Sequence, residues 1–128
     1  MRYYISYFGN IKNIPSGIEV VGIVHTMPKW LKADYRNISD LAPTGQILRL
    51  WKSDQIDWNT YSYLYVRDVL SQLDFRDILF QLGDHDICMC CYEVNGQHCH
   101  RYLVQKWFKV HGIEVAEISN KSGTTLAN

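Results

Sequence analysis

The 128-residue sequence has no excess of charge, because 13 basic residues balance 13 acidic residues. Binding to nucleic acid without sequence preference requires a surplus of Lys and Arg that displaces counterions, so the composition argues against that function. The chain also has no hydrophobic run of the length that a membrane span or a secretory signal needs. We therefore expect a cytoplasmic domain with no membrane partner and no general nucleic-acid binding.

The cysteines are too close together for a disulfide framework, because all four lie within twelve residues. We expect them to be free thiols. Neither G-x-G-x-x-G nor G-x-x-x-x-G-K-[ST] occurs in the chain. This absence excludes the dinucleotide-binding and P-loop phosphate sites that depend on those motifs.

Strand-like and helical patterns alternate along the chain. The strand-like runs are residues 2–7, 18–25, 86–91 and 113–118, and the helical patterns are residues 59–73, 74–82 and 99–111. Such alternation is typical of a mostly parallel sheet with helices packed on it. The sequence therefore predicts a single three-layer, Rossmann-like α/β domain with a small, mostly parallel sheet. We place this domain at residues 1–120 and a polar C-terminal tail at residues 121–128.

Residues 26–57 fit neither pattern. This segment contains Pro28, Pro43 and two tryptophans, and its polarity follows no sustained period. Long connections inside compact domains are uncommon and are often functional. We expect a long excursion with short helical pieces that forms one wall of a cleft.

The stretch from Cys90 to Arg101, CCYEVNGQHCHR, is rich in chemically active side chains. Its possible metal ligands are Cys91, His98, Cys99 and His100. Structural zinc sites usually take cysteine pairs from turns, whereas Cys88 and its neighbours fall in a predicted strand that points them to opposite faces. We therefore predict no metal and no cofactor, with Cys88 and Cys90 packed in the core.

A reactive thiol is a second interpretation of this stretch. Cys99 opens the last predicted helix, where the helix dipole and the adjacent His100 and Arg101 favour a thiolate. Cys91, at the end of a strand and close to Glu93, is another candidate nucleophile. The alternative is that Cys99 only packs beneath the apolar stripe of the helix.

An anion cradle is a third interpretation. A strand, the turn at Asn95-Gly96 and a helix start carrying Arg101 would offer unpaired N–H groups and a guanidinium to a phosphate or carboxylate. Alternatively, Arg101 pairs with Glu93 or with an acid on a helix face. Ligands of open parallel sheets bind at the carboxyl ends of the strands. The other strand ends and the segments that follow them contain Ser6, Tyr7, His25, Pro28 and Trp30.

These residues resemble those of a known family. A strand ending in Cys91, with Glu93 two residues further on and the triplet Cys99-His100-Arg101, is similar to the C-x-E…C-H-R signature of the domain of unknown function 488 family. The segments YYISYFGNIKNIP, IEVVGIVHTMPKW and HGIEVAEI resemble strand regions of that family. The resemblance implies a small Rossmann-like domain of bacteria and their phages, with those five residues as motif positions. The wider family often carries an Asp-Arg pair where this chain has His25-Thr26.

Two classes of function fit these observations. The first is a small-molecule-binding domain that holds a phosphate-bearing, nucleotide-type ligand at the C-terminal ends of the strands. The distribution of the family suggests sequestration of a nucleotide-derived signal in a phage or bacterial defence setting. The expected ligand-binding residues are Ser6, Tyr7, His25, Pro28, Trp30, Cys91, Tyr92, Glu93, Cys99, His100 and Arg101.

The second class is an enzyme that hydrolyses or transfers at a glycosidic or phosphate bond of a nucleotide-like substrate. Its catalytic candidates are Glu93, Cys99 and His100. The expected partner in both classes is a small anionic ligand. The aromatic content of 13% leaves a homo-oligomer or a protein-interaction module open as well.

Overall fold

A computed structural model of the chain describes residues 1–120 and 124–125. Its strands form one sheet in the order β3-β2-β4-β1-β5-β6. Five strands are parallel: β1 (Tyr3–Tyr7), β2 (Glu19–Gly22), β3 (Arg36–Asn37), β4 (Ile87–Cys91) and β5 (Val115–Ile118). The short β6 (Thr124–Thr125) pairs antiparallel with β5. The predicted α/β class, with a small and mostly parallel sheet, is confirmed.

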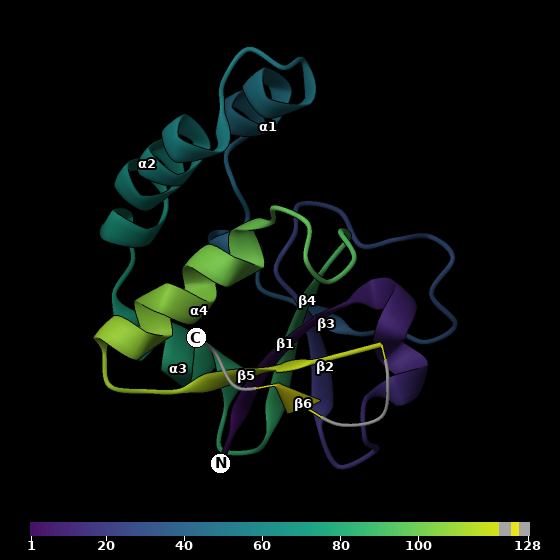
Figure 1. Cartoon of the computed structure of the whole chain (residues 1–128). Coiled ribbons are helices and arrows are strands. Elements are labelled where there is room, and N and C mark those ends of the chain that lie inside the picture. The colour runs from purple at the N-terminus through teal and green to yellow at the C-terminus, as the bar shows by residue number, and fades with distance from the viewer. Residues whose placement is uncertain (121–123, 126–128) are drawn as a thin grey trace.

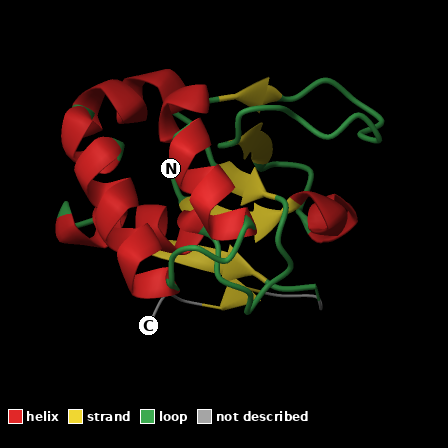
Figure 2. Cartoon of the chain, turned by 90° about the horizontal axis from the view of Figure 1, so that it is seen from above, coloured by secondary structure: helices red, strands yellow, loops and turns green. Residues whose placement is uncertain are grey.

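Helices cover the two faces of this sheet unequally. The α-helices are α1 (Gly45–Lys52), α2 (Trp58–Asp68), α3 (Phe75–Leu82) and α4 (His100–Val110). The 3-10 helices are η1 (Phe8–Asn13), η2 (Ser39–Leu41) and η3 (Leu70–Gln72). Figure 1 and Figure 2 show α2, α3 and α4 on one side of the sheet and η1 on the other. In the described part of the chain, no helix combines the length and the apolar character that crossing a membrane requires.

Short side chains begin three of the α-helices. Thr44, Asp57 and Asp74 each accept a hydrogen bond from a backbone N–H of the first turn of α1, α2 and α3, respectively. Such caps satisfy donors that have no partner within the helix. Gly83 ends α3 with a φ of 95°, a conformation that favours glycine. The observed α3 agrees with the helical pattern predicted at residues 74–82.

The central strand β4 anchors the core. All five of its residues are buried, and it pairs with β1 on one side and β2 on the other. Cys88 and Cys90 are fully buried free thiols, as predicted from their place in the strand. Because β4 ends at Cys91, the core delivers one cysteine directly to the C-terminal edge of the sheet.

The segment after β2 departs from the predicted strand, which extended to His25. The ladder stops at Gly22, and the side chain of Asn37 then accepts from Val24 N–H at 3.1 Å and donates to Val24 C=O at 2.6 Å. The side chain of Asn37 thus takes the place of the backbone hydrogen bonds that a longer β3 would make with Val24, because β3 is only two residues long. The alternating pattern predicted neither β3 nor β6.

The predicted excursion at residues 26–57 contains β3, η2 and α1. Its short helical pieces were expected, whereas its strand was not. Of the predicted tail, only Thr124–Thr125 is described, as β6; residues 121–123 and 126–128 lie outside the described residues.

The strand order reverses at the C-terminal edge of the sheet. The chain leaves β2 toward the edge strand β3, whereas it leaves β4 by way of α4 toward β5 on the other side of β1. The loops after β2 and β4 therefore run in opposite directions from neighbouring strands. In open parallel sheets this reversal of strand order is where ligands bind.

Candidate functional site

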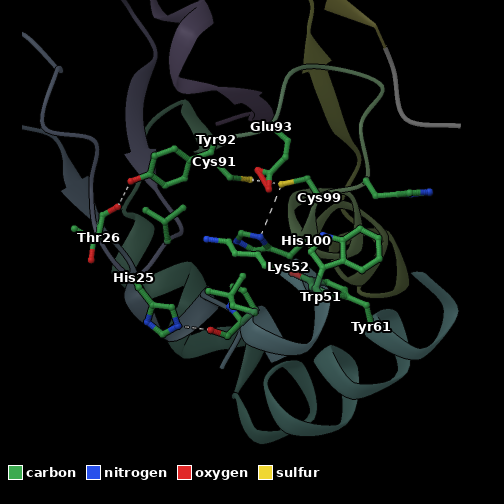
Figure 3. A pocket seen from close by; sticks show the side chains of 14 residues that line it. His25, Thr26, Trp51, Lys52, Tyr61, Cys91, Tyr92, Glu93, Cys99 and His100 are labelled. Atoms are coloured by element: carbon green, nitrogen blue, oxygen red, sulfur yellow. Dashed lines mark hydrogen bonds between the residues drawn. The ribbon is translucent and has the colours of Figure 1, made fainter. Parts of the chain in front are cut away.

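A cavity of about 500 Å³ lies at this reversal point. One side of the cavity comes from the loop after β2, the end of β4 and the start of α4, and α1 and α2 form the opposite side (Figure 3). The lining residues are Val24, His25, Thr26, Pro43, Leu48, Trp51, Lys52, Tyr61, Cys91, Tyr92, Glu93, His98, Cys99 and His100. This volume lies within the range of small-molecule sites in proteins.

Two cysteines meet at one end of the cavity. Cys91 is the last residue of β4, and Cys99 is the N-cap residue of α4. The loop between them folds back so that their Sγ atoms lie 2.8 Å apart, and both residues are free thiols. Only 1% of Cys91 and 3% of Cys99 is exposed, so the thiols are reached through the cavity and not from the outer surface.

His100 stands next to this pair and is held in one orientation. The ring is buried, and its Nε2 donates to the backbone carbonyl of Ile23 at 2.6 Å. Because a carbonyl only accepts, the Nε2 atom carries a proton. The other ring nitrogen, Nδ1, faces the Cys99 Sγ atom at 3.8 Å. His100 is therefore able to take the Cys99 proton.

The surroundings favour a thiolate at Cys99. Burial by itself raises the pKa of a thiol, but hydrogen bonds from Cys91 and His100 and the charges of His100 and Arg101 lower the pKa of Cys99 well below its usual range. Burial raises the pKa of Cys91, and the neighbouring Cys99 raises it further. The pair thus divides into a thiolate at Cys99 and a protonated thiol at Cys91.

Glu93 supplies a carboxyl group on the same side of the cavity. Its side chain points from the loop after β4 toward the two sulfur atoms (Figure 3). Partial burial of the carboxyl, together with the negative charge of Cys99, raises the pKa of Glu93. A carboxyl with a raised pKa is suited to donating a proton.

Arg101 lies behind the thiols, outside the cavity lining. It is fully buried and donates to the backbone carbonyl of Glu93 at 2.6 Å and to Asn95 Oδ1 at 3.2 Å. Its Nη1 also lies 3.8 Å from Cys91 Sγ, and its Nε has no partner among the described residues. The guanidinium therefore holds the loop in shape and contributes positive charge to the thiols from below.

Aromatic rings and cationic groups form the upper wall. Trp51 and Tyr61 line the cavity from α1 and α2, and the ring of His98 stacks on Trp58 at 4.6 Å. Lys52 adds an ammonium group at the rim. The predicted cleft wall in residues 26–57 is thus provided by α1.

The structure brings together six of the residues expected from the sequence: His25, Cys91, Tyr92, Glu93, Cys99 and His100. The others lie outside the lining. Ser6 is buried and donates to Ile118 C=O, and the ring of Tyr7 lies 6.0 Å from the Arg101 guanidinium. Pro28 and the 61% exposed Trp30 lie on the excursion away from the cavity.

Several lining residues were missed. Leu48, Trp51 and Lys52 come from the excursion that shows no sustained sequence period, and Tyr61 lies in the helical pattern at residues 59–73, which did not single it out. One available signal was the N-cap residue Thr44, which marks the start of α1.

One comparison with known proteins identifies the family. The family model described as the active DUF488-N3 subclade matches residues 10–112, a range that contains the whole cavity lining and the Cys99-His100-Arg101 triplet. The chain belongs to the DUF488-N3 family. The resemblance inferred from the C-x-E…C-H-R signature is therefore confirmed for this DUF488-N3 domain. No curated protein and no solved structure matches the chain.

Proposed function

We propose that this DUF488-N3 domain is a thiol-dependent enzyme that acts on a small, ring-containing anion of the nucleotide type. The observation that supports this proposal is the position of Cys99 at the cavity, with Cys91 Sγ at 2.8 Å and His100 Nδ1 at 3.8 Å. A thiolate is the nucleophilic form of cysteine, and an adjacent base is what generates it. The description of the matching subclade as active agrees with an enzyme.

The substrate class follows from the cavity wall. Trp51, Tyr61 and Tyr92 offer ring faces and edges, and Lys52 and His25 place cationic or hydrogen-bonding groups at the rim. A volume of about 500 Å³ accommodates a base or sugar with a phosphate. The anion contact expected from Arg101 is assigned instead to Lys52, because the Arg101 fork is occupied by Glu93 C=O and Asn95, and His25 Nε2 already donates to Pro43 C=O.

The reaction is a displacement at phosphorus or at a glycosidic carbon. The Cys99 thiolate forms a bond to that atom, and the bond to the leaving oxygen or nitrogen breaks with its electron pair. Glu93 in its acid form, which burial and the charge of Cys99 favour by raising its pKa, gives its proton to the leaving group. Water then attacks the Cys99-bound intermediate, Glu93 accepts the proton of that water, and the thiolate is regenerated.

Binding without turnover is the second candidate function. It is favoured by the small exposed fractions of the two cysteines, which restrict how a bulky substrate approaches either sulfur. In that case the thiols only shape the floor of a ligand-binding pocket.

One experiment separates the two candidates. Reduced, metal-free protein is incubated with nucleoside phosphates and nucleotide sugars, and native mass spectrometry records bound ligands, covalent adducts and products. The enzyme proposal predicts a product and an adduct on Cys99, both lost in Cys99→Ala. Glu93→Gln is expected to retain binding and to slow turnover.

Cys88→Ala is the matched control, because Cys88 is fully buried in the same strand as Cys91 and lies outside the cavity lining. It is expected to keep both the product and the adduct. A ligand that binds without any product supports the second candidate. Equal turnover by Cys99→Ala and the parent protein excludes Cys99 as the nucleophile.

A further inference from the structure

Three metal-binding side chains converge at the floor of the cavity. The ligand atoms of Cys91, Cys99 and His100 all lie within 4.8 Å of one another, and all three residues are buried. Two of them stand on either side of a loop, and the third follows directly in α4. The sequence argued against a metal because the cysteines are not spaced as a pair within one turn. In the folded protein, the loop between Cys91 and Cys99 brings the two residues together.

The hydrogen bonds of His100 prepare it as a ligand. Its Nε2–H donates to Ile23 C=O at 2.6 Å, which leaves the Nδ1 lone pair of the neutral ring directed toward the two sulfur atoms. Metal-binding histidines commonly donate the other ring N–H to a carbonyl or carboxylate, which fixes the tautomer and the ring orientation. The second-shell partner of a metal ligand is therefore already in place.

We propose that Cys91, Cys99 and His100 bind one thiophilic divalent cation, of which Zn²⁺ is the representative. Two thiolates and an imidazole match the preference of this ion for sulfur and nitrogen ligands. Three protein ligands leave a fourth position that faces the cavity, which is also the route of access. His98 is not part of the set, because its ring stacks on Trp58.

Binding requires a small local movement. With Zn–S bonds of about 2.3 Å, tetrahedral geometry places two sulfur atoms about 3.8 Å apart, so the present 2.8 Å separation must widen. Cys99 is the residue free to move, because it ends a loop, whereas Cys91 is fixed by the β4 ladder. The two thiolates that form neutralise the charge of the ion.

The cation and the thiolate nucleophile use the same sulfur of Cys99. A bound ion is therefore expected to block the reaction proposed above. The metal site does not depend on that reaction, because it rests only on the geometry of the three side chains. A test that measures binding alone keeps the two proposals separate.

The test is an anaerobic titration of the reduced, metal-free full chain with Co²⁺. One equivalent is expected to produce the intense visible bands of tetrahedral Co²⁺ and a thiolate-to-cobalt charge-transfer band, both displaced by one equivalent of Zn²⁺. Cys91→Ser, Cys99→Ser and His100→Gln are each expected to weaken Zn²⁺ binding by more than the roughly 10- to 100-fold loss typical of second-shell changes. Cys88→Ala, which removes a buried cysteine outside the group, is expected to bind normally.

A second measurement on the unmodified chain covers the case in which a variant does not fold. Zn²⁺ is added before iodoacetamide, and mass spectrometry locates the alkylated cysteines. Protection of both Cys91 and Cys99 by one equivalent of Zn²⁺ supports the site. Weak, octahedral-type Co²⁺ spectra, or unchanged alkylation of both cysteines in the presence of Zn²⁺, overturn it, whether or not the protein proves to be an enzyme.

Discussion

The Sγ atoms of Cys91 and Cys99 lie 2.8 Å apart, although eight positions separate the two residues in the chain. A buried strand fixes the first sulfur, and the start of α4 fixes the second. Arg101 holds the loop between them through Glu93 C=O and Asn95. The site is thus built where one strand, one loop and one helix meet. Its chemistry depends on which of Cys91, Cys99 and His100 carries a proton.

Alkylation of Cys99 is expected to depend little on pH. Because its pKa is well below the usual range, the thiolate is already formed near neutral pH in the metal-free protein. An ordinary thiol has a pKa near 8.5, so its alkylation rate rises roughly tenfold per pH unit below that value. The measurement is the rate of iodoacetamide labelling at Cys99, followed by mass spectrometry between about pH 6 and pH 9.

His100→Gln supplies the comparison for that profile. The substitution removes the hydrogen bond and the charge of His100, which both help to lower the pKa of Cys99. Labelling of the variant is expected to slow near neutral pH and to regain a rise toward alkaline pH. Identical profiles for the variant and the parent protein would contradict the role assigned to His100.

Truncation of Arg101 is expected to destabilise the fold strongly. The side chain is fully buried and donates to Glu93 C=O and Asn95 Oδ1, so Arg101→Ala removes the donor of both acceptors, whereas Tyr102 Oη keeps its hydrogen bond from Gly96 N–H. A buried polar group that loses its hydrogen-bond partner costs about 1–3 kcal/mol of unfolding free energy. The change is measured from urea denaturation midpoints.

Arg67→Ala is the control for this loss. Arg67 is an exposed arginine whose side-chain hydrogen bonds go to the neighbouring Asp68. Ion pairs at such positions contribute little to stability. Its midpoint is therefore expected to stay close to that of the parent protein, and an equal loss in both variants would mean that burial of Arg101 is not the cause.

The sequence was most informative where a local rule decides the structure. The apolar runs predicted β1 and β4, and the helical pattern at residues 74–82 predicted α3, because each pattern depends on neighbouring residues. The convergence of Cys91, Cys99 and His100 depends on the path of a loop, which no periodicity describes. For the same reason Arg101 was assigned to a ligand, although its fork is occupied by the loop itself.

Long-range contacts explain the remaining differences. Trp51 and Lys52 reach the cavity only because α1 lies above the C-terminal end of the sheet, a placement set by tertiary packing (Figure 1). The two-residue strand β3 pairs with β2 across a connection that shows no strand pattern. The sequence does not predict this pairing, because the two residues of β3 are too few to show a strand pattern.

Gly22 is expected to tolerate no side chain. A Cβ atom at this position would lie 2.3 Å from Met27 Sδ and 2.7 Å from Asn37 Oδ1, and Asn37 cannot move without losing its two hydrogen bonds to Val24. Gly22→Ala is therefore expected to cost about 1–3 kcal/mol of unfolding free energy through overpacking. The measurement is again the urea midpoint.

Gly17→Ala is the matched control, because a Cβ atom at Gly17 meets nothing within 4 Å. Its stability is expected to remain close to that of the parent protein. Because Gly22 begins the segment that leads to His25, Gly22→Ala is also expected to weaken any ligand held against that residue. Equal stability of the two variants would show that the backbone after β2 relaxes freely.

The ion pair at the start of β2 gives the protein an acid-sensitive contact far from the cavity. Glu19 accepts from Arg36 Nε and Nη2, both at 2.8 Å, and contacts His85 Nε2 at 2.5 Å. The Arg36 hydrogen bonds, with the added contact from His85, outweigh partial burial and lower the pKa of Glu19 from 4.5 to about 2.

Because the folded-state pKa of Glu19 is depressed, its stabilising contribution is complete above the unfolded-state pKa and is lost as pH falls through the folded-state pKa. Thermal unfolding is expected to show Glu19→Gln less stable than the parent protein near neutral pH. The gap should narrow as pH falls from 4.5 toward about 2. Glu114→Gln, a change at an exposed acid, is the control and should show no such narrowing. If the stability difference between Glu19→Gln and the parent protein stays constant over this pH range, the charge of Glu19 is not what stabilises the fold. Protonation removes only the contribution of the charge, so the packing of the side chain would then be the cause.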